Sequence, residues 1–366
     1  MPRAARWLVL ALLFGASVGL GLGSCAGNHS SLAKTPGGAG PGGSEGGGGH
    51  GADGATGGAP TTTGSGAAGA GGSVPEPVGP NMLTLANGIV DWDEIRLCVV
   101  PYPAGGDSLP WPTNDGLDFA RARAVDPLST VVPADSDVEI HVLAGDLAQS
   151  YGQSCSDLLT APAPADDAAA PLLHASLGVV PSSVFSSNRS LLLVAYGCVG
   201  GPGHTDAVQD QICGATYAPG TPSVALAAGA MSRITEPSHV SLQFADASAA
   251  IMQAQLRMHA GEEAAPAFLV TQYWSLGAIL PYPPWTQFSR QELGVVDQAG
   301  IQIFTSSPAM PAAEITLAQT FANSELGAGD IVDGAGYVLI AVGASPGLPD
   351  GPWWHAFTMT MVRADP

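Results

Sequence analysis

The stretch Asp-Val-Glu-Ile-His-Val-Leu at residues 137–143 alternates apolar and polar side chains without a break after its first residue. Val138, Ile140 and Val142 fall on one face, and the polar residues between them fall on the other. A period of two residues is typical of a β-strand that buries one face and exposes the other. We therefore expect a half-buried strand over residues 137–143.

Short apolar runs of the same kind continue along residues 82–366, separated by Pro, Gly, Asn and Asp. Residues 252–259 alternate strictly, whereas residues 190–196 form a more continuous apolar run that suits a central strand. No segment has the pattern of a long amphipathic helix. Many short strands with turn signals between them favour antiparallel β-sandwiches. Further strands are expected at residues 82–86, 94–100, 128–132, 240–245, 267–271, 301–305, 315–319, 337–342 and 356–362.

The strand candidates form two series that resemble each other in the same order. Leu-Thr-Leu-Ala-Asn at residues 83–87 resembles Leu-Gln-Phe-Ala-Asp at residues 242–246, and Leu-Leu-Val-Ala-Tyr-Gly at residues 192–197 resembles Val-Leu-Ile-Ala-Val-Gly at residues 338–343. A chance likeness between strand patterns is the alternative to a true repeat. We expect two related domains, and they are placed at residues 81–235 and 236–366.

This layout resembles the tandem extracellular domains of the family known as domain of unknown function 4397. The run Phe-Ala-Asp-Ala-Ser-Ala at residues 244–249 is similar to the strand and turn that open that family's repeats, although the Pro-Asp-Ala-Pro that follows there is missing here. The resemblance implies Ig-like sandwiches and a surface location, with no established chemistry. The expected fold is all-β, with two tandem Ig-like antiparallel β-sandwich domains after a disordered tether.

The N-terminal residues 1–24 have the features of a secretory signal peptide. Arg3 and Arg6 precede an uncharged apolar run over residues 7–22, which is too short to span a bilayer comfortably. The sequence Leu-Gly-Ser-Cys that ends at Cys25 resembles the lipobox of bacterial lipoproteins. That resemblance implies that Cys25 is lipidated and becomes the mature N-terminus, and Ala26 then implies sorting to the outer membrane. An ordinary signal peptide with a chance cysteine is the alternative.

The segment that follows Cys25, up to residue 80, has low complexity. Twenty of its 55 residues are Gly, and no aromatic residue occurs in it. Such a composition buries too little apolar surface to offset chain entropy, so we expect a disordered tether over residues 25–80. A flexible coil of that length reaches roughly 40 Å.

The charge of the chain is strongly acidic. The formal net charge is −20, and it becomes −22 without Arg3 and Arg6 of the signal peptide. Such a chain repels phosphate backbones and anionic head groups, so nucleic acid is excluded as an expected partner and membrane attachment should rest on the lipid. Lys34 is the only lysine, which excludes Schiff-base and P-loop lysine chemistry in the folded part.

Four cysteines remain after Cys25, an even number in an exported chain. They are expected to form two disulfides, and the pairing of Cys98 with Cys155 and Cys198 with Cys213 is favoured because each closes a modest loop. The other two pairings stay open. A zinc site is the competing interpretation, but no Cys-x-x-Cys spacing supports it.

No motif in the chain predicts catalysis, a metal or a cofactor. His204 and Asp206, in a glycine-rich loop, could serve a Ser-His-Asp hydrolase, although no serine is marked as their partner. Asp91, Asp93 and Glu94 form an acidic cluster that could hold calcium, but it does not match the known calcium-binding loop. Solvated surface residues are the simpler interpretation in both places.

Two proline-flanked aromatic segments carry the most suggestive chemistry. Tyr102 and Trp111 each lie between two prolines in the first series, and in the second Tyr282 lies between two prolines while Trp285 follows Pro284 directly. Proline stiffens a loop, and rigid Tyr and Trp rings offer flat amphipathic faces to a ligand at low entropic cost. The alternative is that these rings only close the ends of the sandwiches.

The sequence thus predicts a lipid-anchored cell-envelope protein with a non-catalytic, structural or adhesive role. The alternative is a surface module that binds a glycan or a cell-surface protein through Tyr102, Trp111, Tyr282 and Trp285. A secreted hydrolase is the third class of function considered.

Overall fold

The structure, a computed structural model, describes residues 79 and 81–365 apart from residues 126–127, 134, 162–170, 186–187, 262–267, 270–273, 281–285 and 306–309. One compact unit contains all of these residues. We refer to residues 81–235 and 236–366 as its first and second halves. The expected signal peptide, Cys25 and the glycine-rich tether lie outside the described residues.

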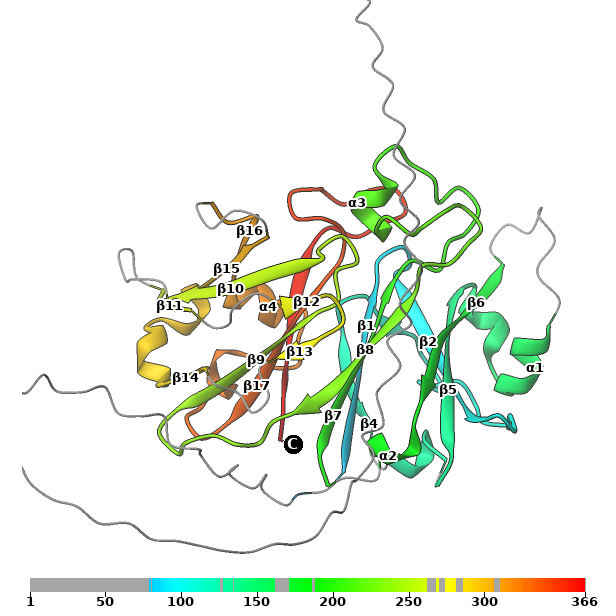
Figure 1. Cartoon of the computed structure of the whole chain (residues 1–366), viewed down its shortest axis with the longest axis horizontal. Coiled ribbons are helices and arrows are strands. Elements are labelled where there is room, and N and C mark those ends of the chain that lie inside the picture. The colour runs from blue at the N-terminus through cyan, green and yellow to red at the C-terminus, as the bar shows by residue number, and fades with distance from the viewer. Residues whose placement is uncertain are drawn as a thin grey trace, which may run out of the picture. The chain divides into compact units, whose positions relative to one another are not determined.

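The described part of the first half is built from strands, three short α-helices and two 3-10 helices, so the expected all-β class is confirmed (Figure 1). Its β5 coincides with the alternating stretch from which the fold was predicted, and Val138, Ile140 and Val142 are buried as expected. Its elements are β1 (Met82–Ile89), β2 (Glu94–Tyr102), β3 (Leu117–Asp118), β4 (Ala122–Val125), β5 (Asp137–Gly145), α1 (Cys155–Thr160), β6 (Leu172–Val180), α2 (Ser182–Phe185), β7 (Ser190–Gly197), α3 (Gln209–Cys213) and β8 (Ala225–Met231).

The second half repeats this strand-rich pattern with a single described α-helix. Its β10 has the predicted alternation, with Ala254, Leu256 and Met258 buried. Its elements are β9 (Val240–Asp246), β10 (Gln253–His259), β11 (Phe268–Leu269), β12 (Trp274–Ser275), β13 (Ile279–Leu280), β14 (Thr286–Phe288), β15 (Gly300–Phe304), β16 (Ala313–Thr316), α4 (Leu317–Ala322), β17 (Gly336–Val342) and β18 (Thr358–Arg363).

Each half contains two sheets that face each other as a sandwich. The first half has the strand orders β4-β1-β7-β8 and β3-β2-β5-β6. The second half has β13-β9-β17-β18, with β14 also paired to β9, and β11-β10-β15-β16, with β12 also paired to β10. Among the described strands, none pairs with a strand of the other half.

The expectation of purely antiparallel sheets is wrong for one pair of strands in each half. β1 runs parallel to β7, and β9 runs parallel to β17. Side chains alternate with a period of two in both kinds of sheet, so the sequence pattern cannot reveal the direction of pairing. The direction follows from the long connection through the other sheet that separates each parallel pair.

Two predicted strands are replaced by other structure. Residues 128–132 form the 3-10 helix η1 (Leu128–Thr130) and a turn in which Val131 and Val132 are both buried, so the alternation of a strand is absent. The strand expected at residues 315–319 ends at Thr316, because Thr316 and Gln319 form a capping box that starts α4.

The central strands β7 and β17 are buried on both faces. Leu191, Leu193 and Ala195 of β7 enter the core of the first half, whereas Leu192 and Val194 pack against the second half. β17 does the same, with Leu339 and Ala341 in its own core and Val338 and Ile340 in the boundary between the halves. The apolar runs without alternation in the sequence therefore mark the strands that carry the contact between the halves.

The two halves share one register as well as one strand order. The sequence repeat aligns Leu85 with Phe244 and Leu193 with Leu339. In the structure, Leu85 pairs with Leu193 in β1 and β7, and Phe244 pairs with Leu339 in β9 and β17. The likeness between the two series therefore extends to the pairing of their central strands.

Two disulfides fix loops of the first half. Cys98 of β2 is bonded to Cys155 at the start of α1, and Cys198 after β7 is bonded to Cys213 at the end of α3. This is the pairing that the short loops favoured in the sequence.

Candidate functional site

The aromatic residues singled out in the sequence are only partly described. Tyr102 lies at the end of β2 and is 49% exposed. Trp111 instead packs against the core of the first half, and its backbone forms hydrogen bonds with Leu97 in both directions. Tyr282 and Trp285 lie outside the described residues. Of the two described rings, Tyr102 is the more open to a ligand.

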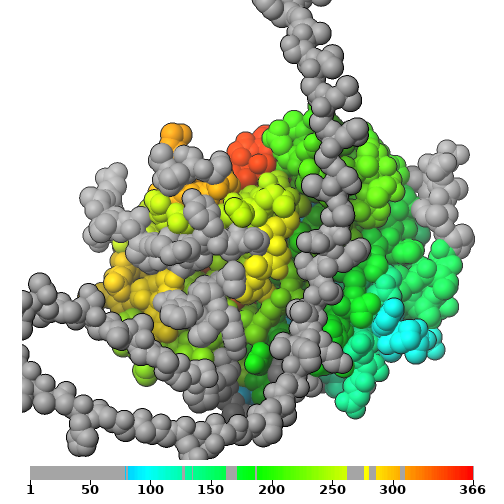
Figure 2. Space-filling view, in the orientation of Figure 1, coloured from blue at the N-terminus to red at the C-terminus, as the bar shows by residue number. Residues whose placement is uncertain are grey.

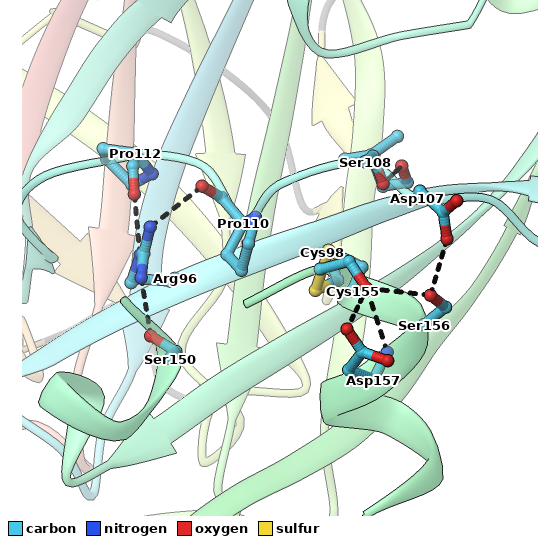
Figure 3. Close-up of a disulfide and its surroundings, with 12 residues drawn as sticks. Arg96, Cys98, Asp107, Ser108, Pro110, Pro112, Ser150, Cys155, Ser156 and Asp157 are labelled. Atoms are coloured by element: carbon cyan, nitrogen blue, oxygen red, sulfur yellow. Dashed lines mark hydrogen bonds between the residues drawn. A yellow bond between two sulfur atoms is a disulfide. The ribbon is translucent and has the colours of Figure 1, made fainter. Parts of the chain in front are cut away.

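A buried arginine holds the loop that carries Trp111 (Figure 3). Arg96 is 1% exposed, and its guanidinium donates to the backbone oxygens of Pro110, Pro112 and Thr113 and to Oγ of Ser150. The buried Arg96 side chain thus supports this loop from beneath through hydrogen bonds to its backbone. The proline-flanked segment is rigid because of this internal network, which favours the structural interpretation of Trp111.

A different group of aromatic residues surrounds a cleft at one end of the boundary between the halves. Three loops form it: the turn after β1, the loop between β7 and α3, and the loop between β17 and β18. Figure 2 shows part of this region, where the loop between β17 and β18 meets the segment around α3. The cleft has a volume of about 430 Å³. Its lining consists of Asp91, Trp92, Asp93, His204 and residues 350–355.

Four rings stand in a row along this cleft. The His204 ring lies between Trp92 and Trp353, at centroid distances of 4.9 and 5.0 Å, and it is stacked on Trp353 with an interplanar angle of 11°. Trp354 meets Trp353 edge to face at 5.0 Å. Since Trp92 and His204 come from the first half and the other two rings from the second, the row joins the halves.

Asp91 organises the loop that presents His204. Its buried carboxylate accepts hydrogen bonds from the backbone N–H groups of Val199 and Gly200 and lies 3.1 Å from Nδ1 of His204. The structure thus places His204 beside Asp91 and not beside Asp206, and the interpretation of His204 as a solvated surface residue is wrong because its side chain is buried. Asp206 accepts from the backbone N–H of Val208 in its own turn instead, because a short Asp side chain readily bonds to the backbone two residues on.

The exposed wall of the cleft is acidic. Asp93 lies 3.1 Å from Nε2 of His355, and its side chain is 92% exposed. The His355 ring stacks on Phe119 at 4.2 Å. Asp350 accepts a hydrogen bond from the backbone N–H of Ala356. The residues that line the cleft include no lysine or arginine, so the wall favours neutral or basic ligands over acidic ones.

The ionisable groups of the lining are carboxylates and imidazoles. It contains a His–Asp pair, and no Ser, Thr or Cys stands among the lining residues. In the part of the chain that the structure describes, no group of three or more His, Cys, Asp or Glu residues is placed to hold a metal ion. The acidic cluster proposed for calcium is divided, because Asp91 is committed to the His204 loop and Asp93 to His355.

Sequence reasoning missed Trp92, Trp353 and Trp354 as members of one site. The available signal was the pattern Asp-Trp-Asp at residues 91–93 together with Trp-Trp-His at residues 353–355. The first follows β1 and the second lies in the loop after β17, two central strands that belong to different halves. The packing of the two halves, which brings these two segments together, has no signature in the sequence.

The disulfide between Cys198 and Cys213 should matter for both stability and the cleft. Replacing both cysteines with Ala opens a loop with a sequence separation of 15 that carries His204, and we expect a loss of about 3 kcal/mol in the free energy of unfolding. Urea unfolding without reductant measures this loss. The matched Cys98→Ala/Cys155→Ala variant should leave ligand binding in the cleft unchanged. If both variants lost ligand binding in the cleft to the same extent, the loop between Cys198 and Cys213 would have no special role in forming the cleft.

Comparisons with known proteins give no family for this chain. No family model matches it, and no curated protein does. One similar solved structure is a candidate cell adhesion protein from Bacteroides eggerthii, at 10% identity and a TM-score of 0.20, over 81% of this chain and 98% of that one. Another is a candidate adhesin from Bacteroides thetaiotaomicron, at 10% identity and a TM-score of 0.18, over 80% of this chain and 100% of that one. Within the described part of the chain, no helix has the length and apolar character needed to cross a membrane.

Proposed function

We propose that this chain is an exported, lipid-anchored surface protein that binds a neutral glycan in the cleft between its halves, without chemical turnover. The observation that carries the proposal is the row of Trp92, His204, Trp353 and Trp354 beside exposed carboxylates. Indole faces can stack on the apolar face of a sugar ring, and carboxylate oxygens can accept hydrogen bonds from its hydroxyl groups. The cleft volume of about 430 Å³ lies within the usual range of small-molecule sites.

Export and anchoring rest on separate support. The signal-peptide pattern of residues 1–24, the lipobox-like sequence before Cys25 and two disulfides agree with a compartment outside the cytoplasm. A lipid on Cys25 then holds the protein in the cell envelope, at the outer membrane. Replacing Cys25 with Ser should release the protein from the membrane fraction, and retention of that variant would contradict the anchor.

Binding is tested on a glycan array with the mature chain and two cleft variants. Trp353→Ala removes an aromatic ring that lines the cleft, and Asp93→Asn neutralises an exposed carboxylate. We expect each to weaken binding tenfold or more, equivalent to about 1.4 kcal/mol. Thermal unfolding shows whether each variant is folded, and a folded Asp93→Asn protein keeps the test decisive even if Trp353→Ala is unstable.

The Tyr102→Ala variant is the matched control, because Tyr102 is exposed on the aromatic loop predicted from the sequence and lies outside the lining of the cleft. It should bind the same glycans as the wild type. If glycan binding is lost in Tyr102→Ala but kept in both cleft variants, the binding site is the aromatic loop and not the cleft. A mature chain that binds no glycan would overturn the proposal as a whole.

A further inference from the structure

A second hollow lies at the opposite end of the boundary between the halves. β1 connects the two places: its first residue, Met82, lines this hollow, and the strand ends two residues before Asp91 of the cleft. The hollow has a volume of about 280 Å³. It shares no lining residue with the cleft, so it is an independent candidate site.

The walls of this hollow are largely apolar. Met82 comes from β1, Ala122 and Ala124 from β4, Leu326 from the segment after α4, and Val362 from β18. Each half therefore contributes part of the wall. Since the space equals that of about nine water molecules, it suits a compact ligand with a short apolar body.

One side chain in the hollow carries a buried N–H donor without a partner among the described residues. Arg363, the last residue of β18, lines it, and the Nε atom of Arg363 is buried with no hydrogen-bond partner among the described residues. A buried N–H donor without an acceptor costs free energy. An anion in the hollow that accepts from Nε would remove this cost.

The charged groups around Arg363 do not supply that anion. Asp365 also lines the hollow, but it lies 3.1 Å from Nε of Arg233 and is committed to that ion pair. Glu325 also lines the hollow, but its side chain is exposed and it forms no ion pair with Arg363 among the described residues. Arg121 lies close by and donates to the backbone oxygen of Ser324. Arg121, Arg233 and Arg363 therefore lie in or near this corner together with the carboxylates of Glu325 and Asp365.

We propose that the hollow binds a small amphipathic carboxylate, with the carboxylate on the guanidinium of Arg363 and the apolar body between Met82, Ala122 and Leu326. Arginine is the side chain best suited to this task, because its N–H groups match the two oxygens of a carboxylate. The surrounding apolar walls select against inorganic anions, which gain nothing from them.

Isothermal titration calorimetry of the mature chain with octanoate tests the site, with octylamine and octanol as matched probes. Octanoate should bind saturably, whereas octylamine and octanol should not. Arg363→Gln should weaken octanoate binding at least tenfold, and Ala122→Leu, which fills the hollow without changing its charge, should do the same. Arg257→Gln is the control, because Arg257 of β10 lies over the ring of Phe304 and away from the hollow. This variant should bind octanoate like the wild type.

Three results would overturn the inference: no saturable binding of octanoate to the wild type, equal binding of octanol, or unchanged binding to a folded Arg363→Gln variant. If Arg363→Gln fails to fold, Ala122→Leu decides in its place. Asp93→Asn of the cleft should bind octanoate normally. A failure at this site therefore cannot be mistaken for a failure of glycan binding.

Discussion

Replacing Asp246 with Asn should stabilise the protein relative to the wild type, and this stabilisation should increase as the pH rises from 4 to 8. Asp246 is fully buried, and burial raises the pKa of its carboxyl from 3.8 to about 8, an effect that a hydrogen bond from the backbone N–H of Ser248 only partly offsets. Its Oδ2 has no hydrogen-bond partner among the described residues. The folded protein therefore holds this carboxyl in its neutral form at pH 7.

The sign of the effect follows from where the proton is bound. Below pH 3.8 the folded and unfolded chains both carry the proton. Between pH 3.8 and about 8 only the folded chain keeps it, so the contribution of Asp246 to stability falls as the pH rises and is lost above about 8. The difference in unfolding free energy between Asp246→Asn and the wild type should grow across this range by on the order of 5 kcal/mol.

The internal repeat supplies the matched control. Asn87 occupies the position equivalent to Asp246, and its amide donates to the backbone oxygen of Leu117 and accepts from the backbone N–H of Ile89. Asn87→Asp should create in the first half the same kind of loss with rising pH that Asp246→Asn removes from the second. Urea unfolding at a series of pH values measures both. A pH-independent difference between Asp246→Asn and the wild type would show that Asp246 is ionised in the folded chain.

Replacing Arg96 with Met should lower the unfolding free energy by about 3–5 kcal/mol. The substitution keeps most of the side-chain volume but removes four hydrogen bonds, and it leaves the buried carbonyl groups of Pro110 and Pro112 without a donor. Each buried polar group that loses its partner costs about 1–3 kcal/mol. Urea unfolding measures the loss.

The control for Arg96 is again its counterpart in the repeat. Arg257 lies in the segment that resembles residues 95–97, but it is half-buried, contacts Gln255 and lies over the ring of Phe304. Arg257→Met should change the unfolding free energy by less than about 1 kcal/mol. Equal losses in the two variants would show that the network around the Trp111 loop adds little to stability.

The fold class was readable from the sequence because side-chain burial follows the period of the backbone. Val138, Ile140 and Val142 alternate with polar residues since one face of β5 meets water. The run at residues 190–196 lacks this alternation because β7 is covered on both faces. The prediction of a strand over residues 315–319 was wrong beyond Thr316. The capping box of Thr316 and Gln319 starts a helix there, and this local signal competes with the apolar run.

The candidate site was much less readable, because its residues meet only after the halves pack together. Trp92 and Trp353 are more than 250 residues apart in the chain, and nothing in either loop specifies the other. His204 was noticed, but its partner was sought nearby at Asp206 and is found at Asp91, across a strand pairing that the sequence does not reveal. The unpaired Arg363 could not be recognised either, since a lone arginine in a sequence gives no sign of its acceptors.

The parallel pairing of β1 with β7 also bears on how the protein responds to mechanical force. A pull on the N-terminal side acts on β1 at Met82, whereas a pull on the loop of His204 acts at the opposite end of β7. Because the strands are parallel, these two pulls act in opposite directions along their axes. The force then shears all the paired positions from Met82–Ser190 to Ile89–Gly197 together, instead of opening them one at a time. The protein should consequently yield only at high tension when pulled through the start of β1 and the His204 loop, and at much lower tension when pulled across the strands.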